Sequence, residues 1–480
     1  MLSGKALKFL YNKNRLLKSV VFFFIIFPLF SYAEIERSGG RILVYLYIPD
    51  VNPQDVNYVM DTLEIRKERG EWISLLEEPV AVRAAEIAGD QIQLTESFVE
   101  AGEYTEMRMR VSDATLKMDN NRYTLALPKP NGEVNIKLAV RIRNEDSVAL
   151  FLIWNPDKSV INRFSFQPSI RFEKQKISSQ TLLLYVANSG SNYLTVIDRF
   201  ENRVVGVIGV GENPTGLVLS KEQGRLYVLN SGSNSISFID TSQDYVVDRI
   251  HLISGIDPVE MAMIPHSNNV DHGKLYITNR GSNDVTVADT FLKAQVKSIR
   301  VGNAPMGITA NPERAEVYVT NSESNSISII DSLSDTVKAT INVGTKPLGI
   351  VVVKDSIYVL NEGSDRITII DLVSKKITGT LLVRGPRMGI YSKQYDKVYL
   401  SNYSTGQVSF LIPTSAVITR SISVGRQPIG VAIDENRNRL YVVNSGSNTV
   451  TVINTVSEVV EKTITVGEKP YGIVSISEFR

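Results

Sequence analysis

Short apolar runs, each closed by polar, glycine or proline residues, follow one another through the last two thirds of the chain. The clearest run, Leu-Tyr-Val-Ala-Asn, begins at Leu184 and leads into the turn-forming stretch Ser189–Asn192. A second run ends at Asp198, a third ends at Gly211, and a fourth starts after Pro214. None of these runs has a helical period, so the pattern predicts four short β-strands.

This four-run unit returns along the chain, and one tyrosine marks each copy. The tyrosines recur about every 42 residues, a period typical of propellers and solenoids. They are Tyr185, Tyr227, Tyr276, Tyr318, Tyr358, Tyr399 and Tyr441. The runs contain few charges, as expected when neighbours cover both faces of a small sheet. The pattern therefore predicts stacked four-stranded sheets.

The copies resemble a known repeat family. The tetrapeptide Tyr-Val-Thr-Asn stands intact at residues 318–321, and the other copies vary it. Residues 181–480 thus resemble the β-propellers named after that tetrapeptide. The resemblance implies an all-β fold with a seven-bladed β-propeller over residues 176–480. In such propellers the Pro-x-Gly run is the innermost strand and the Tyr run is the second. Because the array starts with a Tyr run and ends with Pro-x-Gly at 470–476, we expect the C-terminal strand to close the ring beside residues 182–188.

Residues 34–175 contain no copy of the repeat. They hold strand-like runs at Arg41–Tyr47, Glu106–Val111 and Val148–Ile153, with polar turn residues between runs. This pattern predicts a β-sandwich-like domain. The segment also resembles a bacterial envelope domain of unknown function. The resemblance rests on Gly40–Asp50, Trp72–Leu75, Ala101–Thr105 with Arg108, Asp157–Ser159 and Gln167–Arg171. It implies a location and no chemistry. Members are often lipoproteins, whereas this chain has no cysteine to carry a lipid.

Residues 1–33 have the composition of a secretory signal peptide. Five basic residues without an acid precede the apolar run Val20–Phe30, and Ser31–Ala33 offers a small-x-small cleavage site. A membrane anchor is the alternative, but the run is shorter than the ~20 residues that span a bilayer. Cleavage after Ala33 removes five positive charges from a formal +1 and leaves −4. We therefore expect a chain in the periplasm or outside the cell, without a stable membrane span or a nucleic-acid partner.

The sequence offers little catalytic chemistry. It contains no cysteine, and its three histidines are His251, His266 and His272. His266, Asp271 and His272 share a polar loop, but two histidines without a short ligand spacing are usually solvated, so we expect neither a metal nor a cofactor. Aspartates end many of the second runs, at Asp198, Asp240, Asp289, Asp331 and Asp371. We expect each to bond its own turn.

The copies differ most around the turns that precede Pro-x-Gly, which should ring the mouth of the propeller channel. Basic residues lie on one arc of that ring, and Glu212, Asp257 and Glu260 lie on the opposite arc. Glu260 also replaces the repeat glycine. The candidate ligand-binding residues are Glu260, Lys346, Arg387, Arg426, Lys469 and Tyr471. The alternative is that they are ordinary solvated loop residues.

Two functions remain open. The first is an exported, noncatalytic propeller that acts as a binding or interaction platform at the cell envelope, with an envelope protein or polysaccharide as partner. The second is a hydrolase that resembles the lactonase propellers. The innermost runs, such as Leu217–Leu219 and Ile350–Val352, offer the channel almost no acid or histidine, which favours the first function.

Overall fold

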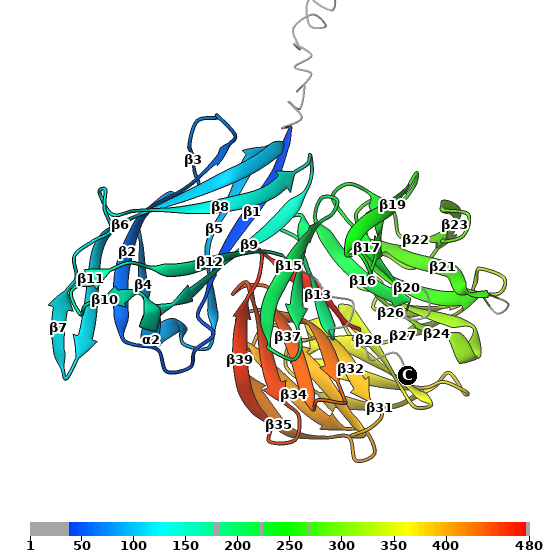
Figure 1. Ribbon diagram of the computed structural model, residues 1–480. Coiled ribbons are helices and arrows are strands. Elements are labelled where there is room, and N and C mark those ends of the chain that lie inside the picture. The colour runs from blue at the N-terminus through cyan, green and yellow to red at the C-terminus, as the bar shows by residue number, and fades with distance from the viewer. Residues whose placement is uncertain (1–37, 176–181, 221–223, 267–268, 477–480) are drawn as a thin grey trace, which may run out of the picture. The chain divides into compact units, whose positions relative to one another are not determined.

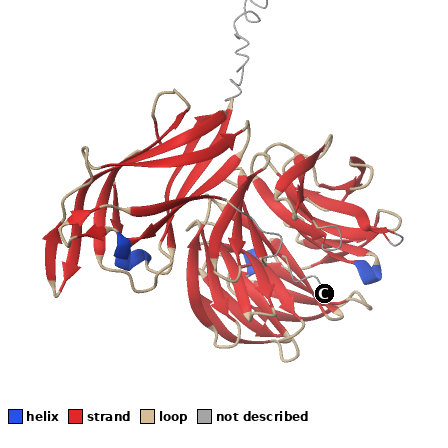
Figure 2. Cartoon of the chain, in the orientation of Figure 1, coloured by secondary structure: helices blue, strands red, loops and turns tan. Residues whose placement is uncertain are grey.

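The computed structural model describes residues 38–175, 182–220, 224–266 and 269–476. Figures 1 and 2 show that these residues form β-strands with very little helix. Gly39–Arg480 forms one compact unit. The predicted signal peptide lies outside the described residues. Residues 176–181, which follow the predicted domain boundary, lie outside them too. Within the described ranges no helix is both long and apolar enough to cross a membrane.

Two larger sheets and the short β10–β11 pair form the N-terminal part (Figure 1). Its elements are β1 (Gly39–Tyr47), β2 (Val56–Lys67), β3 (Ile73–Ser74), β4 (Val80–Arg83), α2 (Ala84–Ile87), β5 (Gln91–Glu100), β6 (Gly102–Met118), β7 (Asn121–Thr124), β8 (Glu133–Ile142), β9 (Ser147–Asn155), η2 (Pro156–Lys158), β10 (Val160–Ile161), β11 (Ser165–Phe166) and β12 (Ser169–Lys174). One sheet has the order β12-β9-β1-β5, with β1 and β9 parallel. The other is centred on β2 and β6.

Both of the larger N-terminal sheets contribute to one hydrophobic core. Burial alternates along β8, as expected for a strand with one face on a core. Trp154 is fully buried there, packs edge-on against Tyr58 with 4.9 Å between ring centroids, and donates its indole N–H to Ser159 at 2.9 Å. The largest side chain of this core is therefore fixed by both packing and a hydrogen bond.

The repeat region consists of seven four-stranded antiparallel sheets in the described residues. The strands are β13 (Leu183–Asn188), β14 (Tyr193–Asp198), β15 (Arg203–Gly209), β16 (Pro214–Ser220), β17 (Arg225–Asn230), β18 (Ser235–Asp240), β19 (Tyr245–His251), β20 (Pro258–His266), β21 (Asn269–Asn279), β22 (Asp284–Asp289), β23 (Ala294–Arg300), β24 (Pro305–Asn311), β25 (Glu316–Asn321), β26 (Ser326–Asp331) and β27 (Thr336–Asn342). They continue as β28 (Pro347–Val353), β29 (Ser356–Asn361), β30 (Arg366–Asp371), β31 (Ile377–Leu382), β32 (Pro386–Ser392), β33 (Lys397–Asn402), β34 (Gln407–Ile412), β35 (Val417–Ser423), β36 (Pro428–Asp434), β37 (Arg439–Asn444), β38 (Thr449–Asn454), β39 (Val459–Thr465) and β40 (Pro470–Ser475). Two 3-10 turns, η3 (Pro312–Arg314) and η4 (Glu362–Ser364), interrupt the loops.

The asparagine that ends each tyrosine strand explains why the motif recurs. Its side-chain amide donates to the hydroxyl of a Ser or Thr seven residues later, as Asn321 does to Ser328 at 3.0 Å and Asn188 does to Thr195 at 2.9 Å. In several repeats the side-chain carbonyl oxygen of this asparagine accepts a hydrogen bond from the backbone N–H of the glycine in the loop before the inner strand. Asn321 accepts from Gly302 in this way at 3.1 Å. The asparagine thus satisfies buried polar groups at the turn between the second and third strands.

The C-terminal strand β40 lies beside β13, the first strand of the repeat array. The two pair antiparallel from Leu184 with Ser475 to Asn188 with Pro470, which is the pairing expected from the order of the copies. Arg199 reinforces this closing sheet, because it donates to the Ile476 carbonyl and forms a buried ion pair with Asp434 at 2.8 Å. The closing sheet therefore joins both ends of the array.

Side chains of the β12-β9-β1-β5 sheet pack against side chains of the closing repeat sheet. Tyr45 and Phe151 belong to the same buried cluster as Val204 and Val207. The Tyr193 hydroxyl donates to Glu96 at 3.0 Å. The two parts of Gly39–Arg480 are therefore joined by a common core as well as by the chain.

Candidate functional site

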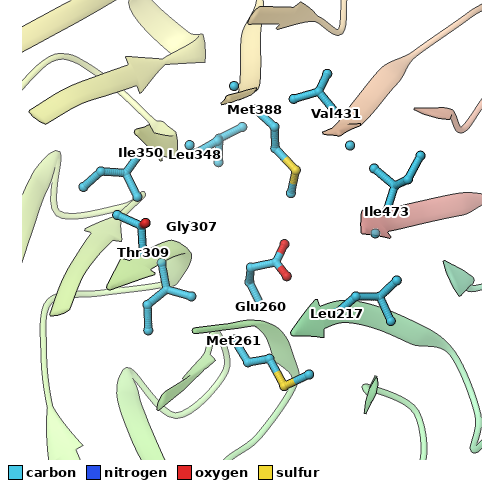
Figure 3. A pocket seen from close by; sticks show the side chains of 15 residues that line it. Leu217, Glu260, Met261, Gly307, Thr309, Leu348, Ile350, Met388, Val431 and Ile473 are labelled. Atoms are coloured by element: carbon cyan, nitrogen blue, oxygen red, sulfur yellow. The ribbon is translucent and has the colours of Figure 1, made fainter. Parts of the chain in front are cut away.

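One edge strand from each repeat sheet faces a central channel. These inner strands are β16, β20, β24, β28, β32, β36 and β40, and each begins with a proline. They line a cavity of about 230 Å³ (Figure 3). Of the described residues that line it, Glu260 alone carries an ionisable side chain. The remainder are glycines, a threonine and apolar residues.

Glycine at the second position after the proline allows the inner strands to approach closely. A Cβ at Gly349 would lie 2.2 Å from the Arg387 carbonyl oxygen, and one at Gly472 would lie 2.2 Å from the Thr215 carbonyl oxygen. Real Cβ atoms do not come so near to backbone, so this position requires glycine in most repeats. Five repeats have it, at Gly216, Gly307, Gly349, Gly430 and Gly472.

Two inner strands depart from this rule, and their side chains enter the channel. Glu260 and Met388 occupy the glycine position. The backbone N–H of each donates to the side-chain hydroxyl of the residue that precedes the motif asparagine. The distances are 3.2 Å from Glu260 to Thr278 and 3.0 Å from Met388 to Ser401. Gly307 makes the same bond to Thr320 at 2.8 Å. Figure 3 shows the side chains of Glu260 and Met388 extending into the open centre.

Sequence reasoning found Glu260 but missed Met388. In the segment Pro386-Arg387-Met388-Gly389 the glycine follows the proline by three positions and not by two, so the Pro-x-Gly pattern alone gives no sign that Met388 takes the place of the repeat glycine. The register places Met388, and not Gly389, opposite Ser401. The longer spacing between Pro386 and Gly389 is the signal in the sequence that could reveal Met388.

Burial perturbs the ionisation of the channel carboxyl. Removal from water raises the pKa of Glu260 to about 7, although the Met261 N–H and the positive charge of Arg387 both lower it. Burial and the nearby Glu260 charge raise the pKa of the Tyr471 hydroxyl to about 12, while Arg387 opposes that rise as a charge and as a hydrogen-bond partner. Electrostatic interactions therefore link Glu260, Arg387 and Tyr471, which lie on three different inner strands.

Arg387 is positioned by an aromatic ring rather than by a carboxylate. Its guanidinium lies 5.7 Å from the centroid of the Tyr403 ring. Within the described part of the chain no ion pair of 4.0 Å or less joins Arg387 to Glu260. Three residues that follow inner-strand prolines, Val259, Met306 and Leu348, pack together as an apolar cluster. The mouth thus combines separated opposite charges with an apolar arc.

The structure places the other candidate residues elsewhere on this rim. Lys346 pairs with Glu362 at 2.8 Å. Arg426 and Lys469 are exposed in the turns before β36 and β40, where their backbone N–H groups bond Ser447 and Asn448. Of the six predicted residues, the structure brings Glu260, Arg387 and Tyr471 together.

Two of the three histidines and the repeated aspartates have local partners. His266 bonds Asp289 at 3.1 Å, and His272 packs against Phe291. The described residues contain no group of three or more potential ligands that could hold a metal ion. Each repeated aspartate accepts N–H groups from its own turn, as Asp198 does from Phe200 at 2.7 Å and Asp331 does from Leu333 at 3.0 Å, so their predicted structural role is confirmed.

Comparison with known proteins identifies the fold. No family model matches the chain, and no curated protein matches its sequence. A protein from Bacteroides uniformis described as a candidate 6-phosphogluconolactonase is similar in structure, with a TM-score of 0.53 and 14% identity over 62% of this chain and 99% of that one. A second such candidate, from Bacteroides fragilis, has a TM-score of 0.52 and 13% identity over 62% of this chain and 98% of its own.

A functionally unknown protein from Desulfotomaculum acetoxidans is similar to the same degree, with a TM-score of 0.52 and 13% identity over 61% of this chain and 98% of that one. At these identities the likeness concerns the fold alone. The neighbours are β-propellers, and the many four-stranded antiparallel sheets of this chain agree with that architecture.

Proposed function

We propose that the chain is an exported, noncatalytic binding protein whose propeller takes a ligand or partner at the mouth of its channel. In this proposal the seven repeat sheets are the seven blades, and residues 34–175 are a β-sandwich that serves as an accessory module. The composition of residues 1–33 supports export to the cell envelope. The partner would be an envelope protein or polysaccharide.

The chemistry of the channel mouth is the observation that carries this proposal. Binding sites are typically apolar cavities with a few well-placed polar groups, and Glu260, Arg387 and Tyr471 supply those groups here. Hydrolysis needs a nucleophile or activated water, a base and a stabiliser of developing charge within mutual reach. The cavity lining offers a single carboxylate among glycines, a threonine and apolar side chains. This composition meets the needs of ligand binding better than those of hydrolysis.

Capture from an envelope extract tests the proposal. The full chain is tagged and compared with a Glu260→Gln/Arg387→Gln double variant, and with a Glu323→Gln/Arg366→Gln double variant that removes the same charges from exposed positions. We expect the wild type and the exposed-site control to retain a specific component that the channel variant loses. Equal retention by all three proteins would place binding away from the channel and refute the proposal.

A lactonase-like hydrolase is the second candidate, and one observation favours it. A carboxyl with a pKa of about 7 is suited to general-base catalysis near neutral pH. A panel of lactones, assayed with and without divalent cations, separates the two functions. Turnover that disappears in Glu260→Gln would establish the hydrolase, whereas absence of turnover in a protein that still captures a partner leaves the binding function.

A further inference from the structure

The channel mouth holds two opposite charges that do not neutralise each other directly. Glu260 projects into the cavity from β20, and Arg387 lies on β32 beside the Tyr471 hydroxyl of β40. Arg387 and Tyr471 each directly precede a residue that lines the cavity, Met388 and Gly472, so they stand at its rim. The carboxylate and the guanidinium interact, yet they form no ion pair within 4.0 Å.

Charges that are partly removed from water and held apart are costly, and a ligand that carries the complementary charges relieves that cost. A cation alone would satisfy Glu260 and would be repelled by Arg387. An anion alone would satisfy Arg387 and Tyr471 and would be repelled by Glu260. A molecule that carries both charges a short distance apart satisfies all three groups.

The size and lining of the cavity limit the rest of the ligand. Its volume of about 230 Å³ is below the roughly 300–1,000 Å³ of pockets that hold drug-sized molecules. Leu348, Ile350, Met388 and Val431 supply apolar lining. A small apolar group therefore fits below the charged rim.

We propose that the channel binds a small zwitterion, an α-amino acid with an apolar side chain. Its ammonium group meets Glu260, its carboxylate meets Arg387 and Tyr471, and its side chain enters the cavity. This inference rests on the proposed function, because it names the ligand class of the same site.

The ionisation of Glu260 supplies a signature for this mode of binding. With a pKa of about 7, the carboxyl is about half protonated at neutral pH. Arg387 from β32 and Tyr471 from β40 are the charged or titratable groups that face it, and Arg280 adds a positive charge near Tyr471. An ammonium group favours the ionised carboxylate, so binding at neutral pH releases a fraction of a proton.

Matched ligands test the proposal by calorimetry on the full chain. The panel contains L-alanine, L-valine, L-leucine, L-methionine and L-phenylalanine. It also contains 3-methylbutylamine and 4-methylpentanoate, which are leucine without its carboxylate and without its ammonium group. We expect at least one amino acid to bind. For leucine, each one-charge analogue should bind about 10- to 100-fold more weakly, the usual value of a hydrogen bond to a charged group.

Variants assign the binding to the channel. Glu260→Gln and Arg387→Gln should each weaken amino-acid binding about tenfold or more. Glu323→Gln and Arg366→Gln, both exposed, should leave it unchanged. Titration in two buffers of different ionisation enthalpy should reveal proton release in the wild type and none in Glu260→Gln. Circular dichroism melting of each variant establishes that it is folded.

Three outcomes overturn the inference: no amino acid binds, the one-charge analogues bind as tightly as leucine, or the channel variants bind like the wild type. If the amino acids fail while an envelope component is still captured through Glu260 and Arg387, the zwitterion is wrong and the proposed function stands. If binding of amino acids succeeds and no envelope component is captured, the channel is a small-molecule site and the macromolecular partner is removed from the proposal.

Discussion

Replacement of Glu260 should change how the stability of the protein depends on pH. The folded chain raises the pKa of this carboxyl from 4.5 to about 7. Below pH 4.5 the group is protonated in both states and its burial costs little. Between pH 4.5 and 7 the unfolded chain ionises while the folded chain keeps its proton, so stability falls as pH rises. Above pH 7 the folded protein carries the full penalty.

The magnitude follows from the two pKa values. The gap between 4.5 and about 7 corresponds to about 3 kcal/mol at about 1.4 kcal/mol per unit of pKa. Glu260 is only partly buried, so solvent in the channel reduces this figure to roughly 2 kcal/mol. Glu260→Gln keeps the shape of the side chain and removes its ionisation. We therefore expect the variant to gain roughly 2 kcal/mol relative to the wild type between pH 5 and pH 8.

Urea denaturation of both proteins at pH 5 and pH 8 measures this difference. Glu323→Gln, which removes an exposed carboxyl, is the matched control and should show no such gain. If the wild type and Glu260→Gln lose stability in parallel as pH rises, Glu260 has an ordinary pKa and the electrostatic description of the channel is wrong.

Three further predictions concern the architecture. Asp434→Asn breaks the buried ion pair with Arg199, in which the Asp434 side chain is 4% exposed and the Arg199 side chain 1%. The free energy of unfolding, measured by chemical denaturation, should fall by about 3–5 kcal/mol, and a fall below about 1 kcal/mol would contradict this prediction. Gly349→Ala places a Cβ 2.2 Å from a carbonyl of the next inner strand and should cost about 2 kcal/mol, while Gly379→Ala, with its nearest neighbour at 3.9 Å, should be tolerated; equal melting temperatures would refute the close approach. Deletion of residues 470–480 removes β40 and exposes the edge of β13, so the melting temperature should fall, and an unchanged value would exclude a closing role for β40.

Much of the repeat architecture could be predicted because it depends on local chemistry. Asparagine and serine in the turns, alternating apolar runs and proline before the inner strand each act within one repeat. The pairing of β40 with β13 followed from the order of the copies. Glu260 stood out because it replaces a glycine at a position where most copies cannot accept a side chain.

The rest depends on which residues meet across repeats, and sequence order does not encode that directly. Arg387 and Tyr471 come from strands separated by another repeat, and only the closure of the sheets brings them near Glu260. Lys346 is a candidate ligand-binding residue by sequence, but the structure pairs its ammonium group with Glu362. Met388 entered the channel through a one-residue shift after Pro386, which the regular spacing of the other copies concealed.

A photoreactive methionine analogue at Met388 tests the central claim most directly, because this side chain extends into the channel. The full chain is exposed to envelope extract, irradiated, and analysed by mass spectrometry for adducts at residue 388. A second protein carries the analogue at Leu333, which is 82% exposed, as the control for random labelling. We predict a defined adduct at position 388 that is lost in Glu260→Gln and absent at position 333. Labelling at 388 that survives Glu260→Gln unchanged, or no adduct above the Leu333 control, would contradict a binding role for the channel.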